Sequence, residues 1–199
     1  KNGGNVVFGC RSGYKDKTGQ CYMKPFPGVL SELCGVTVEE FSLHNENQPA
    51  PLIRTEFGTL QSEGFSEVLH VQSESVEVVA SYDDDRYYET KPALVKNSMG
   101  KGKVYYFGGV FTEESAKFLL EELQITSPVR EWISLPQKVE LAIRTGKSGE
   151  EYVFLLNYSE EKQTLHVKDK RINLLTDEAV EGAYTIEPFG VVLLSSLED

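Results

Sequence analysis

The stretch that decides the fold of the first half of the chain is KPALVKNSMGKGKVYYFGG, residues 91–109. It contains two runs rich in Val, Tyr and Phe, at 92–99 and 103–109, on either side of the short segment MGKGK. Such runs favour strands, and glycine supplies the positive φ that a tight connection needs at no steric cost. We therefore predict two strands joined by a hairpin-type turn.

Other elements can be predicted on the amino-terminal side of this hairpin. Strand-like composition predicts strands at 5–10, 36–43, 67–71 and 76–82. PGVLSELCG, residues 27–35, predicts a short helix, with Pro27 near its start and Gly35 at the C-cap position. Residues 44–65 are polar and broken by prolines and glycines, so we expect a long loop there.

On the carboxyl-terminal side, TEESAKFLLEELQI, residues 112–125, is the clearest helix signal in the chain. Thr112 can cap this helix, and the two glutamates that follow complement the helix dipole. Its apolar stripe is predicted to consist of Ala116, Leu119, Leu120 and Leu123. The first part of the chain is therefore predicted to be mixed α and β.

The pattern changes at TSPVREWISLPQ, residues 126–137, a connector that contains Pro128 and Pro136. Only strand signals follow it, near ten residues apart, which is typical of a small antiparallel sandwich or barrel. We expect strands in 138–146, 151–159, 163–168, 171–176, 182–187 and 189–196. The predicted domains are 1–127 and 128–199, with Trp132 packed between them.

Composition excludes several classes of partner. The chain has 199 residues, 40% of them hydrophobic and 26% charged, as expected for a globular protein. The net charge of −11 argues against nucleic acid and against an anionic membrane surface. No apolar run approaches the roughly 18 residues that span a bilayer. Three cysteines suit a reducing compartment, and a start at Lys1 without Met suggests a piece of a longer protein.

GCRSGYKDKTGQCY, residues 9–22, invites three chemical interpretations. The first is a thiol nucleophile at Cys10, at the end of a strand as in a nucleophile elbow. An elbow needs a helix directly afterwards, but RSGYKDKTGQ is polar and turn-like. The available bases would be His44, His70 and His166, and none is placed convincingly. A packing role at the strand end is the favoured interpretation of Cys10.

The other two interpretations of this stretch are a metal or disulfide clip and a phosphate loop. Cys10 and Cys21 lack metal-ligand spacing, although a Cys10–Cys21 disulfide is conceivable. A phosphate loop fails because Asp16 stands where the second glycine should be. Cys34 lies in an apolar segment and is expected to be a small buried hydrophobe. No cofactor or metal site is predicted.

Two further motifs have alternative interpretations. DDDRYYE, residues 83–89, could bind a cation or sugar hydroxyls, but a solvated loop is favoured. Asn157-Tyr158-Ser159 matches a glycosylation acceptor, yet its apolar surroundings favour a core strand that ends in a turn.

Several stretches together resemble one family. Residues 3–41, from GGNVVFGCRSGYKDKTGQCY to PFPGVLSELCGVTVEEF, resemble the start of the trimerisation domain in glycoside hydrolase family 42 β-galactosidases. The segment 91–109 is similar to the family's Pro-Ala, Gly-x-Gly and Val-Tyr-Tyr segment. KVELAIRTGKSGEEYVFLLNYSEE and YTIEPFGVVLL are similar to its small C-terminal β-domain.

The resemblance implies a parent enzyme and a place for this chain within it. The parent would be a retaining β-galactosidase whose two catalytic glutamates stand on a (β/α)8 barrel, which this sequence lacks. No Glu of this chain would be catalytic, and the galactoside would bind to the missing barrel. The chain would serve homotrimer assembly, in the cytoplasm of a bacterium.

The resemblance also implies a fold. We expect an α/β domain of flavodoxin-like or class I glutamine amidotransferase-like type, incomplete at its N-terminal side, followed by a small all-β antiparallel sandwich. Two alternative functions remain open at this point. They are a carbohydrate-binding or interaction module, and an amidotransferase-like thiol hydrolase that uses Cys10.

Overall fold

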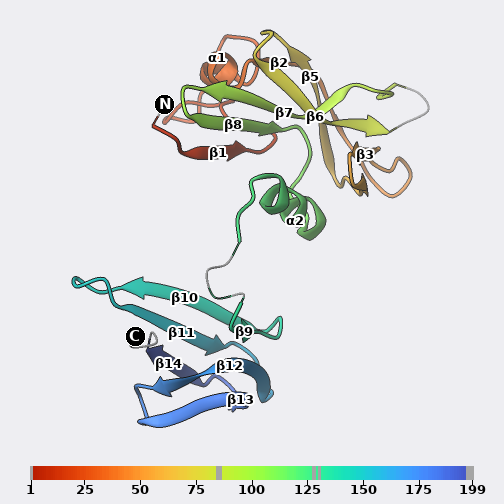
Figure 1. Cartoon of the computed structure of the whole chain (residues 1–199). Coiled ribbons are helices and arrows are strands. Elements are labelled where there is room, and N and C mark those ends of the chain that lie inside the picture. Colours follow the sequence, from red (N-terminus) through yellow and green to blue (C-terminus); the bar gives the residue numbers. More distant parts are fainter. Residues whose placement is uncertain (1, 84–86, 127–128, 130, 196–199) are drawn as a thin grey trace. The chain divides into compact units, whose positions relative to one another are not determined.

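The computed structural model describes residues 2–83, 87–126, 129 and 131–195 (Figure 1). The chain divides into two compact units, Lys1–Ile125 and Thr126–Asp199. The boundary expected at 127/128 falls on residues outside the described ranges.

The main sheet of the first unit has six strands in the order β1-β8-β7-β6-β3-β4. β1 lies parallel to β8, and every other pair in this sheet is antiparallel. The strands are β1 Asn5–Phe8, β3 Leu52–Thr55, β4 Gly58–Leu60, β6 Val76–Asp83, β7 Pro92–Met99 and β8 Gly102–Phe107.

The predicted hairpin is confirmed and lies at the centre of this sheet. β7 and β8 pair from Leu94 with Phe107 to Met99 with Gly102, and Gly100 in the turn has φ 64°. Both faces of the hairpin are covered, which explains why its sequence is continuously apolar rather than alternating. Its buried side chains include Ala93, Leu94, Val95, Val104, Tyr105, Tyr106 and Phe107.

A separate two-stranded ribbon packs beside the main sheet. It consists of β2 Val36–Leu43 and β5 Phe65–Val71, which are antiparallel. A 3-10 turn, η1 Gly28–Leu30, and the short helix α1 Ser31–Cys34 lead into β2. Gly35 ends α1 at φ 68°, as predicted, and Cys34 is fully buried, also as predicted.

The helix α2 Glu113–Glu122 begins as the sequence predicts. The Thr112 side chain accepts a hydrogen bond from the Ser115 amide, and the Ser115 hydroxyl accepts one from the Thr112 amide. The predicted stripe was partly wrong, because Ala116 and Leu120 are exposed. The helix instead buries Ser115, Phe118 and Leu119, with Leu123 partly packed against the same cluster.

Two predictions for the first unit need correction. Residues 44–65 are not one long loop, because β3 and β4 form within them. β3 is held by pairing with β6, 31 residues away in sequence where Leu52 meets Asp83, and by complete burial of Ile53. The flavodoxin-like arrangement is not supported either. Such folds need repeated parallel strands linked by helices, and the described part of this unit has a single parallel pair.

The second unit is all-β and antiparallel, as predicted. Its sheet runs β10-β11-β14-β12-β13, with β9 paired to β12. The two strands expected at 163–168 and 171–176 form one long strand, with a register shift between Val167 and Arg171. The strands are β9 Ile133–Ser134, β10 Val139–Thr145, β11 Glu151–Asn157, β12 Gln163–Asn173, β13 Glu178–Ile186 and β14 Val191–Ser195.

The core of the second unit comes from the inward-facing positions of these strands. Its fully buried members include Leu155, Val167, Val180 and Leu194. Trp132, expected to pack between the domains, packs against this core, and the Arg171 guanidinium lies 4.0 Å from its ring centroid. No helix in the described ranges is long and apolar enough to cross a membrane.

We expect Thr112→Ala to lower the free energy of unfolding by about 1 kcal/mol, because it removes the cap of α2. Urea denaturation followed by circular dichroism measures this change. Lys117→Ala is the matched control on the same helix. Its exposed ion pair with Glu113 (2.7 Å) should contribute less than the cap, because solvent screens exposed charges. Equal losses in the two variants would contradict a specific role for the cap.

Candidate functional site

The turn that follows β1 contains the candidate thiol Cys10. β1 ends at Phe8, and the chain then reverses with Arg11 at φ 64° and Gly13 at φ 73°. No helix follows, and a β-bridge joins Lys15 to Cys21 instead. The local backbone therefore lacks the strand-turn-helix of a nucleophile elbow.

Beneath this turn lies Glu67 of β5, whose side chain is completely buried. Its Oε1 accepts hydrogen bonds from the Arg11 amide (2.7 Å) and the Tyr14 hydroxyl (2.8 Å). Its Oε2 accepts one from the Tyr106 hydroxyl of β8 (2.8 Å), and the Tyr82 hydroxyl of β6 donates to the Glu67 carbonyl (2.9 Å). One carboxylate thus connects the turn, the ribbon and the main sheet.

The surroundings in this cluster raise the pKa values of its carboxyl, tyrosine and thiol groups, which disfavours the charged form of each. Burial raises the pKa of Glu67 above its usual range, although the three donors oppose that shift. Burial and the Glu67 charge together raise the pKa values of Tyr14 and Tyr106. Burial first, and then the Glu67 charge, raise the pKa of Cys10 to about 11. The Cys10 thiol is therefore protonated at neutral pH.

This arrangement is the reverse of what a reactive cysteine needs. A nucleophile elbow uses the backbone N–H after the nucleophile to stabilise an oxyanion. Here that N–H belongs to Arg11 and is already bonded to a carboxylate. Reactive thiols lie in electropositive surroundings that lower their pKa, whereas Glu67 raises the pKa of Cys10. The structure gives the thiol-hydrolase alternative no support.

The remaining chemistry of residues 9–22 is also structural. All three cysteines are free, so the conceivable Cys10–Cys21 disulfide is absent. Asp16 accepts hydrogen bonds from the Thr18 amide (2.8 Å), the Thr18 hydroxyl (2.7 Å) and the Gln20 amide (3.1 Å). These bonds lower its pKa and close the loop. No cluster of metal-ligating side chains occurs in the described part of the chain.

The three histidines proposed as bases lie in different places. His70 is exposed on β5, and His166 is exposed on β12 of the second unit. His44 follows β2, and burial lowers its pKa. The Gln48 backbone partly opposes this lowering of the pKa. Neither ring nitrogen of His44 has a hydrogen-bond partner among the described residues. Within the described ranges, no hydrogen bond joins Cys10 to any of them.

His44 lines a hollow of the first unit, which we call the β2–β3 groove and which has a volume of about 760 Å³. At its rim the Tyr87 hydroxyl donates to the Glu40 carboxylate. The Lys91 ammonium lies 4.9 Å from the Tyr87 ring centroid and 3.6 Å from a carboxylate oxygen of Glu39. The groove is lined by Glu40, Ser42, Leu43, His44, Asn47, Gln48, Pro49, Ala50, Pro51, Tyr87 and Tyr88.

Sequence reasoning missed most of this groove, because 44–65 was interpreted as a loop. Its only signal was the pair of tyrosines in DDDRYYE. Residues 84–86 of that motif lie outside the described ranges. Asp83 forms an ion pair with Arg54, and Tyr88 is buried beside Tyr82 and His44.

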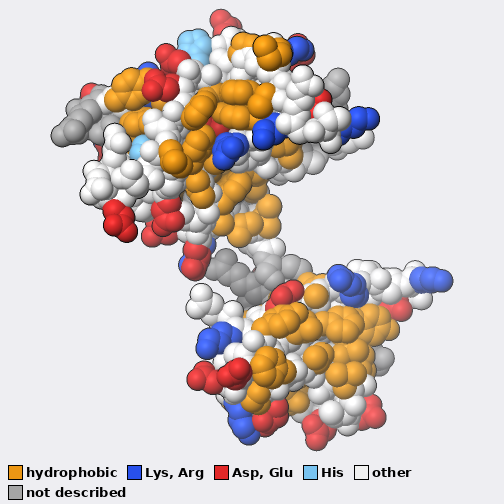
Figure 2. Space-filling view, turned by 180° about the vertical axis from the view of Figure 1, so that it is seen from behind, with side chains coloured by type: hydrophobic (Ala, Val, Ile, Leu, Met, Phe, Trp, Pro, Cys, Tyr) orange, Lys and Arg blue, Asp and Glu red, His pale blue; other side chains and the backbone are white. Residues whose placement is uncertain are grey.

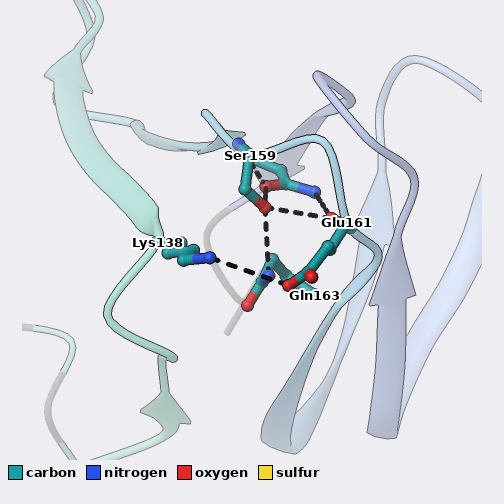
Figure 3. Close-up of polar contacts among 5 residues, drawn as sticks. Lys138, Ser159, Glu161 and Gln163 are labelled. Atoms are coloured by element: carbon teal, nitrogen blue, oxygen red, sulfur yellow. Dashed lines mark hydrogen bonds and ion pairs between the residues drawn. The ribbon is translucent and has the colours of Figure 1, made fainter.

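In the second unit, the apparent glycosylation acceptor Asn157 is a buried structural group. Figure 3 shows the polar contacts of Ser159, Glu161 and Gln163 at this site. The Asn157 amide donates to the carbonyls of Glu161 (2.8 Å) and Glu187 (2.9 Å). Its oxygen accepts from the Ser159 amide (2.9 Å) and hydroxyl (2.8 Å). Gln163 in turn donates to the Ser159 hydroxyl (3.0 Å). Asn157 therefore ties the ends of β11 and β13 together, and the predicted core strand ends at this residue.

Comparisons with known proteins identify both units. Residues 1–130 match the model of the β-galactosidase trimerisation domain, and residues 138–196 match that of the β-galactosidase C-terminal domain. β-Galactosidase Pbg of Clostridium perfringens is 30% identical over 96% of this chain, and BgaP of Planococcus sp. (strain L4) is 28% identical over 99%. This chain spans only 28% and 29% of the length of these two relatives.

Solved structures give the same result. The β-galactosidase from Bacillus circulans sp. alkalophilus superposes with a TM-score of 0.80 at 26% identity, over 98% of this chain and 29% of that one. The β-galactosidase from Rahnella sp. R3 gives 0.76 at 25% identity, over 98% and 28%.

The fold and these matches define the chain as a pair of β-galactosidase accessory domains. The chain belongs to the β-galactosidase trimerisation-domain family, with the β-galactosidase C-terminal domain after it. The resemblance to glycoside hydrolase family 42 is therefore confirmed.

We predict that Glu67→Gln lowers the free energy of unfolding by about 1–3 kcal/mol at low pH, because the amide nitrogen cannot accept the hydrogen bonds that both carboxyl oxygens accept. This cost should shrink as pH rises. A carboxyl with a raised folded-state pKa stabilises the fold fully below its ordinary value of 4.5 and loses that contribution as pH rises through the folded-state value. Glutamine has no such dependence.

Urea denaturation of both proteins from about pH 4 to about pH 8 tests this prediction. Glu63→Gln, on an exposed residue of the same region, is the control and should change little. A cost of Glu67→Gln that grows with pH would show that the folded-state pKa is lowered instead.

We also predict that iodoacetamide at about pH 7.5 alkylates Cys21 well before Cys10 and Cys34. Cys21 is exposed, whereas burial raises the pKa of Cys34 to about 12 and that of Cys10 to about 11. Peptide mass spectrometry of timed samples measures the three rates. A Cys10 rate equal to or above that of Cys21 would reopen the thiol-hydrolase alternative.

Proposed function

We propose that this chain is the homo-oligomeric assembly portion of a retaining β-galactosidase that hydrolyses terminal β-D-galactosyl residues. The galactoside would bind to a catalytic (β/α)8 barrel outside these 199 residues. The parent enzyme would be a homotrimer in the bacterial cytoplasm.

The observation that carries this proposal is the coverage of the matches. Nearly the whole chain aligns with β-galactosidases, yet it accounts for only 28–29% of the two relatives described above. The family over residues 1–130 takes its description from trimerisation rather than from hydrolysis. That description supports a role in bringing copies of the chain together.

The carboxylates of this chain fit the same proposal. Retaining hydrolysis needs two carboxyl groups about 5 Å apart that flank the substrate. Glu67 is the only fully buried carboxylate among the described residues, and its hydrogen-bond partners are an amide and two tyrosines. Glu67 is therefore occupied in stabilising the fold. No observation on the described residues of the second unit supports the alternative that its β-domain binds sugar.

We expect the purified chain to self-associate and to leave nitrophenyl β-galactoside unhydrolysed. Light scattering coupled to size-exclusion chromatography, over a range of concentrations, measures its mass. Absorbance of released nitrophenol measures hydrolysis.

Two results would contradict the proposal. One is a monomer at every concentration, and the other is turnover that persists after repeated purification. The intact parent enzyme is the positive control for the hydrolysis assay.

A further inference from the structure

Met23 and Leu43, two apolar side chains of the first unit, are left largely uncovered by its described residues. Met23 is 95% exposed in the segment Lys15–Pro25, which we call the 15–25 loop. Leu43 is 77% exposed at the end of β2, on the rim of the β2–β3 groove. Hydrophobic side chains reach the surface of both units in Figure 2. A single exposed apolar side chain is common at a protein surface, so the case for a partner contact rests on the groove beside Leu43 and on the charges around both side chains.

The charges around these two side chains are opposite in sign. The 15–25 loop carries Lys15, Lys17 and Lys24, all exposed. Its one acid, Asp16, is turned back onto the loop amides. By contrast, residues 36–51 contain Glu39, Glu40 and Glu46 and no Lys or Arg. Lys91, from outside that segment, lies 3.6 Å from Glu39.

The loop and the groove lie apart within the unit. The Val38 amide donates to the Phe26 carbonyl (2.6 Å), so the start of β2 adjoins the end of the 15–25 loop. Leu43 is five residues further along the strand, about 16 Å away at the usual rise. Figure 1 accordingly shows α1 and β3 toward opposite ends of this unit. A single copy therefore does not place its own loop in its own groove.

Complementary patches at separate places on one surface are what a ring requires. A cyclic trimer is built from heterologous contacts, in which one patch of each copy meets a different patch of the next copy. Methionine suits such a contact, because its flexible thioether fills irregular apolar hollows. Flanking lysines opposite glutamates would fix the orientation and speed the encounter.

We propose that the β2–β3 groove of one copy receives the 15–25 loop of a second copy, with Met23 against Leu43 and Tyr87 and the loop lysines beside Glu39 and Glu40. This inference rests on the proposed homo-oligomeric assembly and identifies the surfaces that perform it. It makes the contact heterologous and therefore able to close into a ring.

Leu43→Asp places a charge in the groove surface, and Met23→Asp places one in the loop surface. Each variant therefore loses one of the two proposed contact surfaces and keeps the other. Both side chains are exposed, so folding should be unaffected, and circular dichroism checks this. Each variant alone should associate about tenfold or more weakly than the unchanged chain. Mixed one to one, the two variants should form a dimer and nothing larger, because each supplies the surface that the other lacks. Light scattering and sedimentation velocity measure these masses.

Leu175→Asp, on an exposed leucine of the second unit, is the matched control and should leave association unchanged. Raising the salt concentration should weaken association of the unchanged chain, because exposed charge pairs are screened.

The outcomes separate this inference from the proposed function. If the unchanged chain is monomeric throughout, the assembly role itself is wrong. If it associates but Leu43→Asp and Met23→Asp do not weaken it, or if their mixture forms no dimer, only the assigned surfaces are wrong. If Leu43→Asp removes a calorimetric response to galactose and leaves the mass unchanged, the groove is a sugar site and the inference is overturned.

Discussion

The first unit depends on the burial of one carboxylate. An acid as completely buried as Glu67 is costly unless donors surround it, and its three donors come from parts of the chain that are far apart in sequence. Arg11 and Tyr14 belong to the turn after β1, and Tyr106 belongs to the central hairpin. Satisfying this acid fixes the turn against the sheet. It also explains why a turn that looks reactive in sequence holds an inert thiol.

The second unit also has a buried polar side chain that connects its strands, but this side chain is neutral. Asn157 is buried at the end of β11, and its amide donates to carbonyls on two other segments while its oxygen accepts from Ser159. In both units a polar residue that resembles a functional motif is instead a fixed connection between strands. Such fully satisfied buried networks specify one arrangement of a core, because every alternative leaves a polar group unpaired.

With Glu67 and Asn157 satisfied in their interiors, the units offer their surfaces for function. The first unit has a hydrophobic residue in a basic loop and another on the rim of an acidic groove. Neither feature contributes to the core, so neither is explained by folding. A fixed interior together with exposed apolar side chains on the surface suits a domain that assembles with other copies, since association then adds contacts without rearranging the fold.

Local physical rules determined much of this protein from its sequence. The 92–107 hairpin, the Thr112 cap and the Gly35 helix end depend on residues within a few positions of one another, and all three were predicted correctly. The ordered motifs were also sufficient to identify the family. Only the tertiary structure revealed β3, the β2–β3 groove and the role of Glu67. Each depends on partners far away in the chain: β3 needs β6, and the Glu67 carboxylate needs Arg11, 56 residues earlier. Sequence patterns report the preference of a segment for a conformation, whereas the burial of a charge and its donors are decided only when distant segments meet.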